Sequence, residues 1–435
     1  MRVVVPLFFI AVGLTGCGGG GLTDGGAAMN RVAEDYVKLV LRVGQHDPGY
    51  VDAYYGPPEW ATDAEADPGT LDAIRKSAAG LRERLASLAP GDEVADMEVL
   101  RYRYLTKQLA AVAARIDMLE GKQFSFDEES RALYDAEAPV NDEEHFRELI
   151  RAIDRVLPGT GPLYQRYADF RRDFVIPNDK LNAVFTAAID ACRERTVRHI
   201  ELPADESFRV EYVTDKPWSG YNWYQGNDHS LIQVNTDLPI FIDRAIDLAC
   251  HEGYPGHHVY NSMLETHLTR ERGWVEYSVY PLFSPQSLVA EGSANYGIEM
   301  AFPGHQRADF EREVLFPLAG IDPARADEYY RVQELVGRLS YAGNEAARRY
   351  LDGQIDSTQA AEWLSRYALM DPARAAQRVR FIDTYRSYVI NYNLGRDLVR
   401  AWVEREAGPD ATADERWAVF GELLSSPRLP ANLVE

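Results

Sequence analysis

Apolar side chains recur along most of the chain with the spacing of amphipathic helices. Near the start of the folded part they occupy positions i, i+4, i+7, i+8 and i+11: Val32, Tyr36, Leu39, Val40 and Val43. Such spacing places them on one helical face. Similar patterns predict further helices over 71–88, 99–119, 181–200, 287–300, 306–318, 326–350, 358–368, 372–391 and 396–406. Another is expected after Asp142, where two glutamates suit the positive end of a helix.

Strand-like alternation is confined to the middle of the chain. Residues 208–213 and 230–235 alternate apolar and polar side chains and predict two strands. Between them, residues 220–226 predict a turn rich in Trp and Tyr, and residues 126–138 predict an irregular acidic connection. We therefore expect a mainly α protein with a small β-sheet, in a single domain over residues 29–435.

The N-terminus has the pattern of a targeting segment. Arg2 precedes an apolar run, Val3 to Leu14, of 12 residues, which is too short to span a bilayer as a helix. The following Leu-Thr-Gly-Cys, ending at Cys17, resembles a bacterial lipobox. We expect residues 1–16 to be a signal peptide and residues 17–28 a Gly-rich tether from lipidated Cys17. This predicts an outer-membrane lipoprotein facing the periplasm, or an extracellular anchored protein if the source has one membrane.

Composition narrows the classes of partner. The chain has 435 residues, 46% hydrophobic and 26% charged, with a formal charge of −22, so nucleic acid and anionic lipid are not expected as main partners. We expect the two remaining cysteines, Cys192 and Cys250, to be unpaired and to pack as small buried hydrophobic residues. A disulfide between them in an oxidising compartment is the alternative.

Residues 250–258 read Cys-His-Glu-Gly-Tyr-Pro-Gly-His-His and contain three of the nine histidines. Zinc binds neutral imidazole and carboxylate, and two ligands on one helix usually come from positions i and i+4. Here the residue four positions after His251 is Pro255, which cannot ligate and whose ring would clash with the carbonyl of His251 in a regular helix. The sequence therefore predicts a break or bulge at residues 254–256.

Two histidines beyond this break can complete a pair with His251. If the bulge absorbs two residues, His257 falls where the i+4 ligand would be, so His251 and His257 are the predicted pair. His258 remains the alternative ligand. Glu252, beside the first ligand, is the expected general base for a metal-activated water. Asp247, one turn before His251, is a candidate acceptor for the ligating imidazole.

A catalytic zinc site needs a third protein ligand. Glu291 is embedded in an apolar helical stretch and opens the pattern Glu-Gly-x-Ala-x-Tyr-x-x-Glu, far enough after His257 for a loop and a returning helix. Glu299, two turns later, is the rival ligand or a supporting partner.

These two motifs resemble the bacterial domain-of-unknown-function 885 family. The segments 125–134, 233–235 and 392–395 also look like segments of that family. The resemblance implies a large helical zincin-like metallopeptidase fold, with the sheet bordering the active-site cleft. It also implies that His251, His257 and Glu291 hold zinc and that Glu252 is the base. Tyr392 sits where a Tyr could donate to an oxyanion, although a core role is equally open.

The chain departs from the family pattern at two places. Ser293 stands where members usually carry Trp, which predicts a larger pocket. The Asp-x-x-x-His stretch of many members has no counterpart in residues 340–360, which leaves substrate contacts and activity open. In a zincin-like cleft, the strand 230–235 would offer its edge to an extended peptide. The cleft wall would include Trp218, Tyr221, Trp223 and Tyr224, with ordinary aromatic packing as the alternative.

The leading hypothesis is a zinc-dependent hydrolase of peptide or related amide bonds, bound to the membrane through the lipid on Cys17. A catalytically inactive zincin-fold binding or scaffold lipoprotein is one alternative. A zinc hydrolase of a non-peptide amide or ester is the other.

Overall fold

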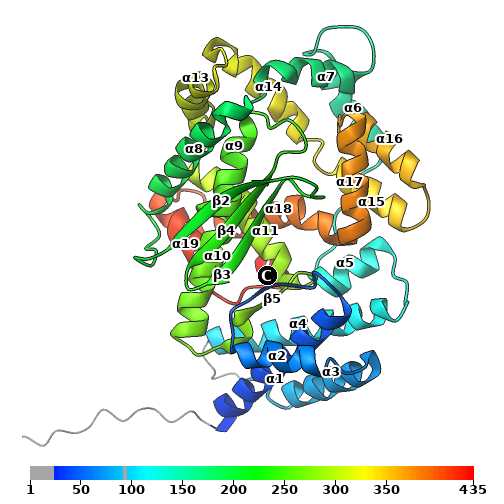
Figure 1. Cartoon of the computed structure of the whole chain (residues 1–435), viewed down its shortest axis with the longest axis vertical. Coiled ribbons are helices and arrows are strands. Elements are labelled where there is room, and N and C mark those ends of the chain that lie inside the picture. The colour runs from blue at the N-terminus through cyan, green and yellow to red at the C-terminus, as the bar shows by residue number, and fades with distance from the viewer. Residues whose placement is uncertain (1–23, 92–95) are drawn as a thin grey trace, which may run out of the picture.

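The computed structural model describes residues 24–91 and 96–435, and most of these residues are helical (Figure 1). The prediction of a mainly α protein is confirmed. The predicted signal peptide and Cys17 lie outside the described residues. Helix α1 begins at Asp24, so its first turn occupies the last part of the predicted tether. Among the described residues, no helix combines the length and the apolar character that crossing a membrane requires.

The first half of the chain forms an N-terminal group of helices and then a second group that leads to the sheet. These helices are α1 (Asp24–His46), α2 (Pro58–Ala66), α3 (Leu71–Ala86), α4 (Asp96–Leu119), α5 (Phe126–Tyr134), α6 (Glu143–Asp154), α7 (Leu163–Arg171) and α8 (Leu181–Thr196). Figure 1 shows α1 to α4 gathered at one end of the molecule and α6 and α7 at the other.

The second half is helical after the sheet. Its helices are α9 (Asp243–Leu248), α10 (His257–Leu264), α11 (Pro285–Ala301), α12 (Gln306–Phe310), α13 (Phe316–Ala319), α14 (Ala326–Gly337), α15 (Ala342–Leu351), α16 (Ser357–Tyr367), α17 (Pro372–Tyr385), α18 (Ile390–Ala407), α19 (Ala413–Leu424) and α20 (Pro430–Val434). Three segments widen into π-helix: Ala249–Gly253, Glu265–Arg270 and Glu311–Leu315.

Five strands form two small sheets. Strands β2 (Ser207–Val213), β3 (Gly220–Gly226) and β4 (His229–Asn235) make a sheet in the order β2-β4-β3, with β4 parallel to β2 and antiparallel to β3. Strands β1 (Val51–Tyr54) and β5 (Val279–Pro281) form an antiparallel pair. Because β4 is central, both of its edges are already paired.

Local structure differs from the sequence prediction in two segments before the site. Residues 126–134 form helix α5 rather than an irregular connection, because Ser125 and Glu128 make a reciprocal capping box. Residues 220–226 form strand β3 rather than a turn. Their aromatic side chains favour a pleated, half-buried surface, and their pairing with β4 supplies the partner that the local pattern does not reveal.

Two predicted helices also have different bounds. The predicted helix over 326–350 is interrupted between α14 and α15. The gap predicted at residues 392–395 is helical, inside α18.

Two hydrophobic cores stabilise the helical body. The larger one runs from α1 through the sheet to α20. The smaller one lies among α6, α7 and α14 to α17, around residues such as Phe146, Trp363 and Leu364. Figure 1 shows the three-stranded sheet across the middle of the molecule, between the end that holds α1 to α4 and the end that holds α6 and α7.

Cys192 on α8 and Cys250 in the π-helical segment form a disulfide, with their Cα atoms 5.5 Å apart. The expectation of two unpaired buried cysteines is therefore wrong. Spacing alone could not reveal the pair, because 58 residues separate the two cysteines and only the packing of α8 against the π-helical segment brings them together.

Candidate metal centre

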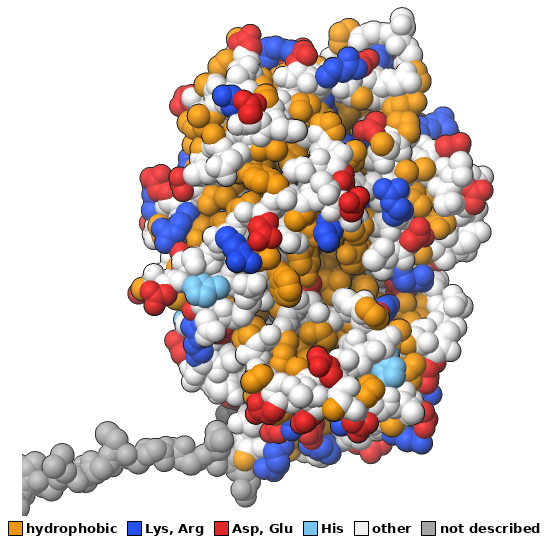
Figure 2. Space-filling model, in the orientation of Figure 1, with side chains coloured by type: hydrophobic (Ala, Val, Ile, Leu, Met, Phe, Trp, Pro, Cys, Tyr) orange, Lys and Arg blue, Asp and Glu red, His pale blue; other side chains and the backbone are white. Residues whose placement is uncertain are grey.

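A cavity of about 890 Å³ opens between the three-stranded sheet and the helices packed beside it. Its walls come from β1, β3, α9, the π-helical segment, α11, α17 and α18, among other segments. Figure 2 shows this face hollowed near its centre, with hydrophobic side chains deep in the hollow and charged ones around it. Glu252 and all three predicted metal ligands line the cavity.

The helix that carries the first histidine breaks as the sequence predicts. Helix α9 widens into π-helix at Ala249, where the Tyr254 amide donates to the Ala249 carbonyl over 3.3 Å. The Tyr254–Pro255 peptide is cis, and α10 begins at His257. The wider turn and the break together carry the chain past Pro255, so that His257 lies beside His251 with their ring centroids 4.7 Å apart.

Gly256 makes this break possible by close backbone approach. Its amide donates to the Cys250 carbonyl over 2.9 Å. A Cβ at this position would lie only 1.8 Å from the carbonyl oxygen of His251. No larger residue fits without moving the backbone that holds the first ligand.

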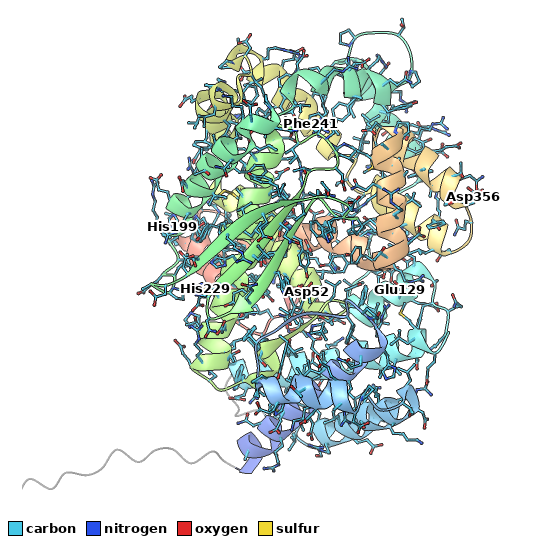
Figure 3. The ribbon with its side chains drawn as sticks, in the orientation of Figure 1. Asp52, Glu129, His199, His229, Phe241 and Asp356 are labelled. Atoms are coloured by element: carbon cyan, nitrogen blue, oxygen red, sulfur yellow. A yellow bond between two sulfur atoms is a disulfide. The ribbon has the colours of Figure 1, made fainter. Side chains whose placement is uncertain are left out.

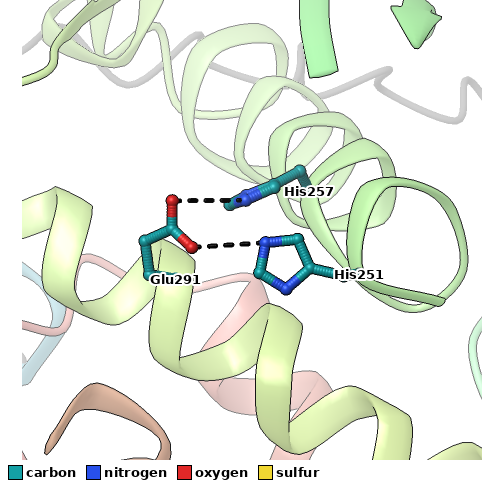
Figure 4. Close-up of side chains that lie close together, drawn as sticks. All are labelled: His251, His257 and Glu291. Carbon is teal, nitrogen blue, oxygen red and sulfur yellow. Dashed lines mark ion pairs between the residues drawn. The ribbon is translucent and has the colours of Figure 1, made fainter. Parts of the chain in front are cut away.

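Helix α11 supplies the third group of the centre, Glu291. Its Oε2 lies 3.2 Å from Nε2 of His251 and its Oε1 lies 3.8 Å from Nε2 of His257 (Figure 4). One ligand atom from each of the three residues lies within 4.8 Å of the others. Tetrahedral coordination with bonds of 2.0–2.1 Å needs ligand atoms roughly 3.3 Å apart, so the donor set fits a metal ion after small side-chain movements.

The surroundings of Glu291 suit a metal ligand. Tyr388 donates to Oε1 over 2.8 Å, whereas Oε2 is buried and lies 3.2 Å from Nε2 of His251. A buried carboxylate needs a nearby positive charge, and a bound cation would supply that charge without a proton on His251.

Burial and the neighbouring charges together shift the pKa values of the two imidazoles in opposite directions. Burial acts to lower the pKa of His251, but the contact with Glu291 and the charge of Glu252 raise it overall. Burial lowers the pKa of His257 to about 4. Burial acts to raise the pKa of Glu291, yet both histidines hold it below its ordinary value. His257 is therefore neutral and ready to ligate at neutral pH, whereas a metal must compete with a proton for His251.

Glu252 has the surroundings of a general base. Its side chain is 4% exposed, and burial, helped by the charges of Glu291 and Asp52 and opposed by that of His251, raises its pKa to about 7. Asn222 on β3 donates to its backbone carbonyl over 2.6 Å. A Cβ at Gly220 would lie 2.7 Å from Oε1 of Glu252, so the glycine gives the carboxylate its space against the strand.

His258, the alternative ligand, lies outside this group. Its Nδ1 is 2.9 Å from the Ser230 hydroxyl and its Nε2 is 3.0 Å from Glu206. Both ring nitrogens are occupied by protein, and the ring is fully buried. His258 therefore ties α10 to the sheet and to the segment before β2.

The two acids expected to support or replace the ligands have other partners. Asp247 pairs with Arg244 at 2.9 Å and with Arg307 at 2.7 Å, and Glu299 pairs with Arg400. The role proposed for Asp247 as acceptor of the His251 imidazole is therefore wrong in this structure. Tyr388, which the sequence did not single out among 25 tyrosines, instead contacts Glu291, one of the predicted ligands.

The predicted cleft wall is correct in part. Trp218 and Tyr221 line the cavity, whereas Trp223 is 48% exposed on the sheet and Tyr224 is buried against Glu265. The strand expected to offer its edge, β4, is central; the edge strand at the cavity is β3. Ser293 is buried in α11 and is not among the described residues that line the cavity.

One pair in the wall was not foreseen. The hydroxyl of Tyr221 donates to Asp52, which β1 brings to the lower end of the sheet (Figure 3). Burial raises the pKa of Asp52 to about 6. The hydrogen bond from Tyr221 acts to lower this pKa, and the charge of Glu291 acts to raise it. No local motif marks Asp52, because it reaches the cavity only through the β1–β5 pairing.

Comparison with known proteins gives likeness of fold alone. No family model matches the chain, and no curated protein matches it. Among solved structures, a "putative lipoprotein" from Colwellia psychrerythraea has a TM-score of 0.50 at 13% identity, covering 84% of this chain and 68% of its own. The M32 carboxypeptidase from Deinococcus radiodurans R1 has a TM-score of 0.46 at 14% identity, covering 94% and 93%. Pyrococcus furiosus carboxypeptidase has a TM-score of 0.39 at 12% identity, covering 92% and 97%.

Proposed function

We propose that this protein is a zinc-dependent hydrolase of peptide bonds or related amide bonds, with a carboxypeptidase-like action. One observation carries the proposal: His251, His257 and Glu291 converge in a cavity beside the buried carboxyl group of Glu252. Two imidazoles and one carboxylate are the ligand set of several catalytic zinc sites, which keep a further position for water or substrate.

A zinc ion held by these three residues would supply Lewis-acid polarisation of the carbonyl and activation of water. The chain's own residues perform the proton transfers. Glu252 takes the proton from the attacking water and returns it to the leaving amine. A carboxyl whose pKa lies near the working pH can both accept and donate a proton, and burial gives Glu252 that property.

Tyr392 is the proposed donor to the oxygen that becomes negative in the transition state. Its ring stacks over that of His251 at 6.4 Å, and it lines the cavity. No described group forms a hydrogen bond with its hydroxyl, so that hydroxyl is free for substrate. A hydrogen-bond donor aimed at developing charge stabilises the transition state more than the ground state.

The shape of the cavity favours an extended substrate. Strand β3 forms the edge of the sheet and contributes Gly220, Tyr221 and Asn222 to the wall. A peptide can add to such an edge through main-chain hydrogen bonds. The carbonyl to be attacked would then lie between β3 and the metal ligands.

Metal content and turnover test this proposal together. We expect the purified protein to bind one zinc ion per chain and to hydrolyse members of a peptide panel. Glu252→Gln should keep the metal and lose turnover, and His257→Ala should lose both. Absence of zinc after reconstitution would contradict the proposal. Equal behaviour of wild type and Glu252→Gln on every substrate would favour a binding or scaffold role, and hydrolysis of only esters or non-peptide amides would favour the other alternative.

We further propose that lipid on Cys17 anchors the protein to the outer membrane, facing the periplasm. The disulfide supports an oxidising compartment, and the lipobox-like sequence supports the anchor. Metabolic labelling with a radioactive fatty acid should mark the wild-type protein but not Cys17→Ala. Equal labelling of the two would contradict the anchor.

A further inference from the structure

The cavity contains much positive charge for so acidic a protein. The whole chain has a formal charge of −22, yet seven arginines and seven acids line the cavity. Six of these arginines lie within 4.0 Å of a carboxylate. The remaining one, Arg378 on α17, has no carboxylate and no hydrogen-bond partner among the described residues.

The position of Arg378 relates it to the metal centre. Its guanidinium carbon lies 4.6 Å from the ring centroid of Phe381 and 5.9 Å from that of Tyr392. The ring of Tyr392 also stacks with that of His251, with the centroids 6.4 Å apart. Tyr392 therefore lies near both the free guanidinium and the first of the proposed metal ligands.

Arg378 is placed against rings rather than in open water. Burial lowers its pKa, against the charges of Tyr392 and Glu291, which act to raise it. A guanidinium remains charged even so. An arginine packed against aromatic rings with its hydrogen-bond donors free is a ready partner for an anion.

We propose that Arg378 binds a carboxylate of the substrate and so selects substrates that carry a negative charge near the bond that is cut. This inference rests on the proposed hydrolase function. The planar fork of a single guanidinium matches a carboxylate. A phosphate, with its higher charge, would meet more repulsion from the acids of the cavity.

Two sources of such a carboxylate are chemically equivalent at Arg378. It can be the free C-terminus of a peptide, which would make the enzyme an exopeptidase. It can also be the side chain of an Asp or Glu residue inside a longer chain. The same guanidinium would recognise both, so the test must compare them.

Binding is best measured without turnover, on zinc-loaded Glu252→Gln protein, by isothermal titration. Three ligands are compared: an N-acetyl dipeptide with a free C-terminus, its C-terminal amide, and an amidated peptide with Glu in the second position. We expect at least one carboxylate ligand to bind roughly 10- to 100-fold more tightly than the neutral amide, as hydrogen bonds to charged groups allow. Preference for the free C-terminus or for the Glu peptide identifies the source.

Variants of Arg378 decide whether this residue is responsible. When Arg378→Met is added to the Glu252→Gln protein, the affinity for the carboxylate ligand should fall to that for the amide. Arg378→Lys should retain part of the preference for the carboxylate. Arg380→Met, which changes an exposed arginine on the same helix, should leave the preference intact. Thermal unfolding verifies that each variant is folded. If Arg378→Met does not fold, the loss of preference is measured with Arg378→Lys instead.

The proposal is overturned if Glu252→Gln does not distinguish carboxylate from amide, or if Arg378→Met keeps the full preference. Its failure is separable from that of the hydrolase function. If the wild-type protein cuts neutral amidated substrates as efficiently as substrates with a carboxylate, the hydrolase function stands and the role of Arg378 is refuted. If the protein binds carboxylates through Arg378 but cuts no substrate, the role of Arg378 stands and the hydrolase function is refuted.

Discussion

Tyr388 on the segment before α18 donates a hydrogen bond of 2.8 Å to Oε1 of Glu291 on α11. The two residues lie 97 positions apart in the chain. The bond orients the carboxylate so that its other oxygen faces His251, 3.2 Å away. Partners of this kind set the orientation and basicity of a metal ligand.

We therefore expect Tyr388→Phe to weaken metal binding by roughly 10- to 100-fold, the usual cost of losing a hydrogen-bond partner of a ligand. Competition with a chromophoric zinc chelator measures the affinity. Tyr385→Phe is the matched control, because its ring packs 6.0 Å from Tyr388 and its hydroxyl has no described hydrogen-bond partner. Equal affinities for wild type and Tyr388→Phe would show that the bond does not tune the site.

Gly220→Ala should impair turnover while sparing metal binding. The added methyl group would lie 2.6 Å from Cδ2 of Leu248 and 2.7 Å from Oε1 of Glu252, so it would displace both side chains and move the carboxyl away from the attacking water. A small displacement of a catalytic group commonly costs about 10²-fold in rate, so kcat should fall far more than zinc content. Gly80→Ala, on α3 with nothing within 4 Å of its new methyl group, should leave both unchanged. Unaltered kcat in Gly220→Ala would argue against Glu252 as the base.

The disulfide should stabilise both the fold and the metal centre. Replacing Cys192 and Cys250 with Ala should lower the free energy of unfolding by roughly 2–4 kcal/mol. Because Cys250 directly precedes His251, zinc affinity should fall as well. Urea unfolding and chelator competition measure the two effects. A reducing agent should lower the stability and the zinc affinity of the wild type but not those of the double variant. Detection of two free thiols in the native oxidised protein would contradict the pairing.

The stability of the metal-free protein should depend on the ionisation of Asp52. Burial raises its pKa to about 6 in the folded state, so between its ordinary value and about 6 the folded state binds more protons than the unfolded state. Stability must then fall as pH rises through that window. Relative to Asp52→Asn, which cannot ionise, the wild type should lose roughly 3 kcal/mol between pH 3.5 and 7. Parallel pH profiles of the two proteins in urea unfolding would contradict this assignment.

Short-range physics made part of this protein predictable. Helical periodicity identified most of the long helices, because a face of apolar side chains must be buried wherever the helix packs. Pro255 alone excluded a regular helix through the site, since its ring and missing amide act within one turn. The choice of His257 followed from that break, and the structure places its ring beside His251.

Tertiary structure decided whatever depends on contacts between distant segments. The Cys192–Cys250 disulfide, the hydrogen bond from Tyr388 and the approach of Asp52 join positions whose spacing has no local signature. The same holds for β3, which is a strand because β4 lies beside it, and for Arg378, whose lack of a partner is visible only once the cavity is assembled. Local sequence could place the histidines and Glu291 on helices, but only the packing of those helices could bring the three side chains to one point.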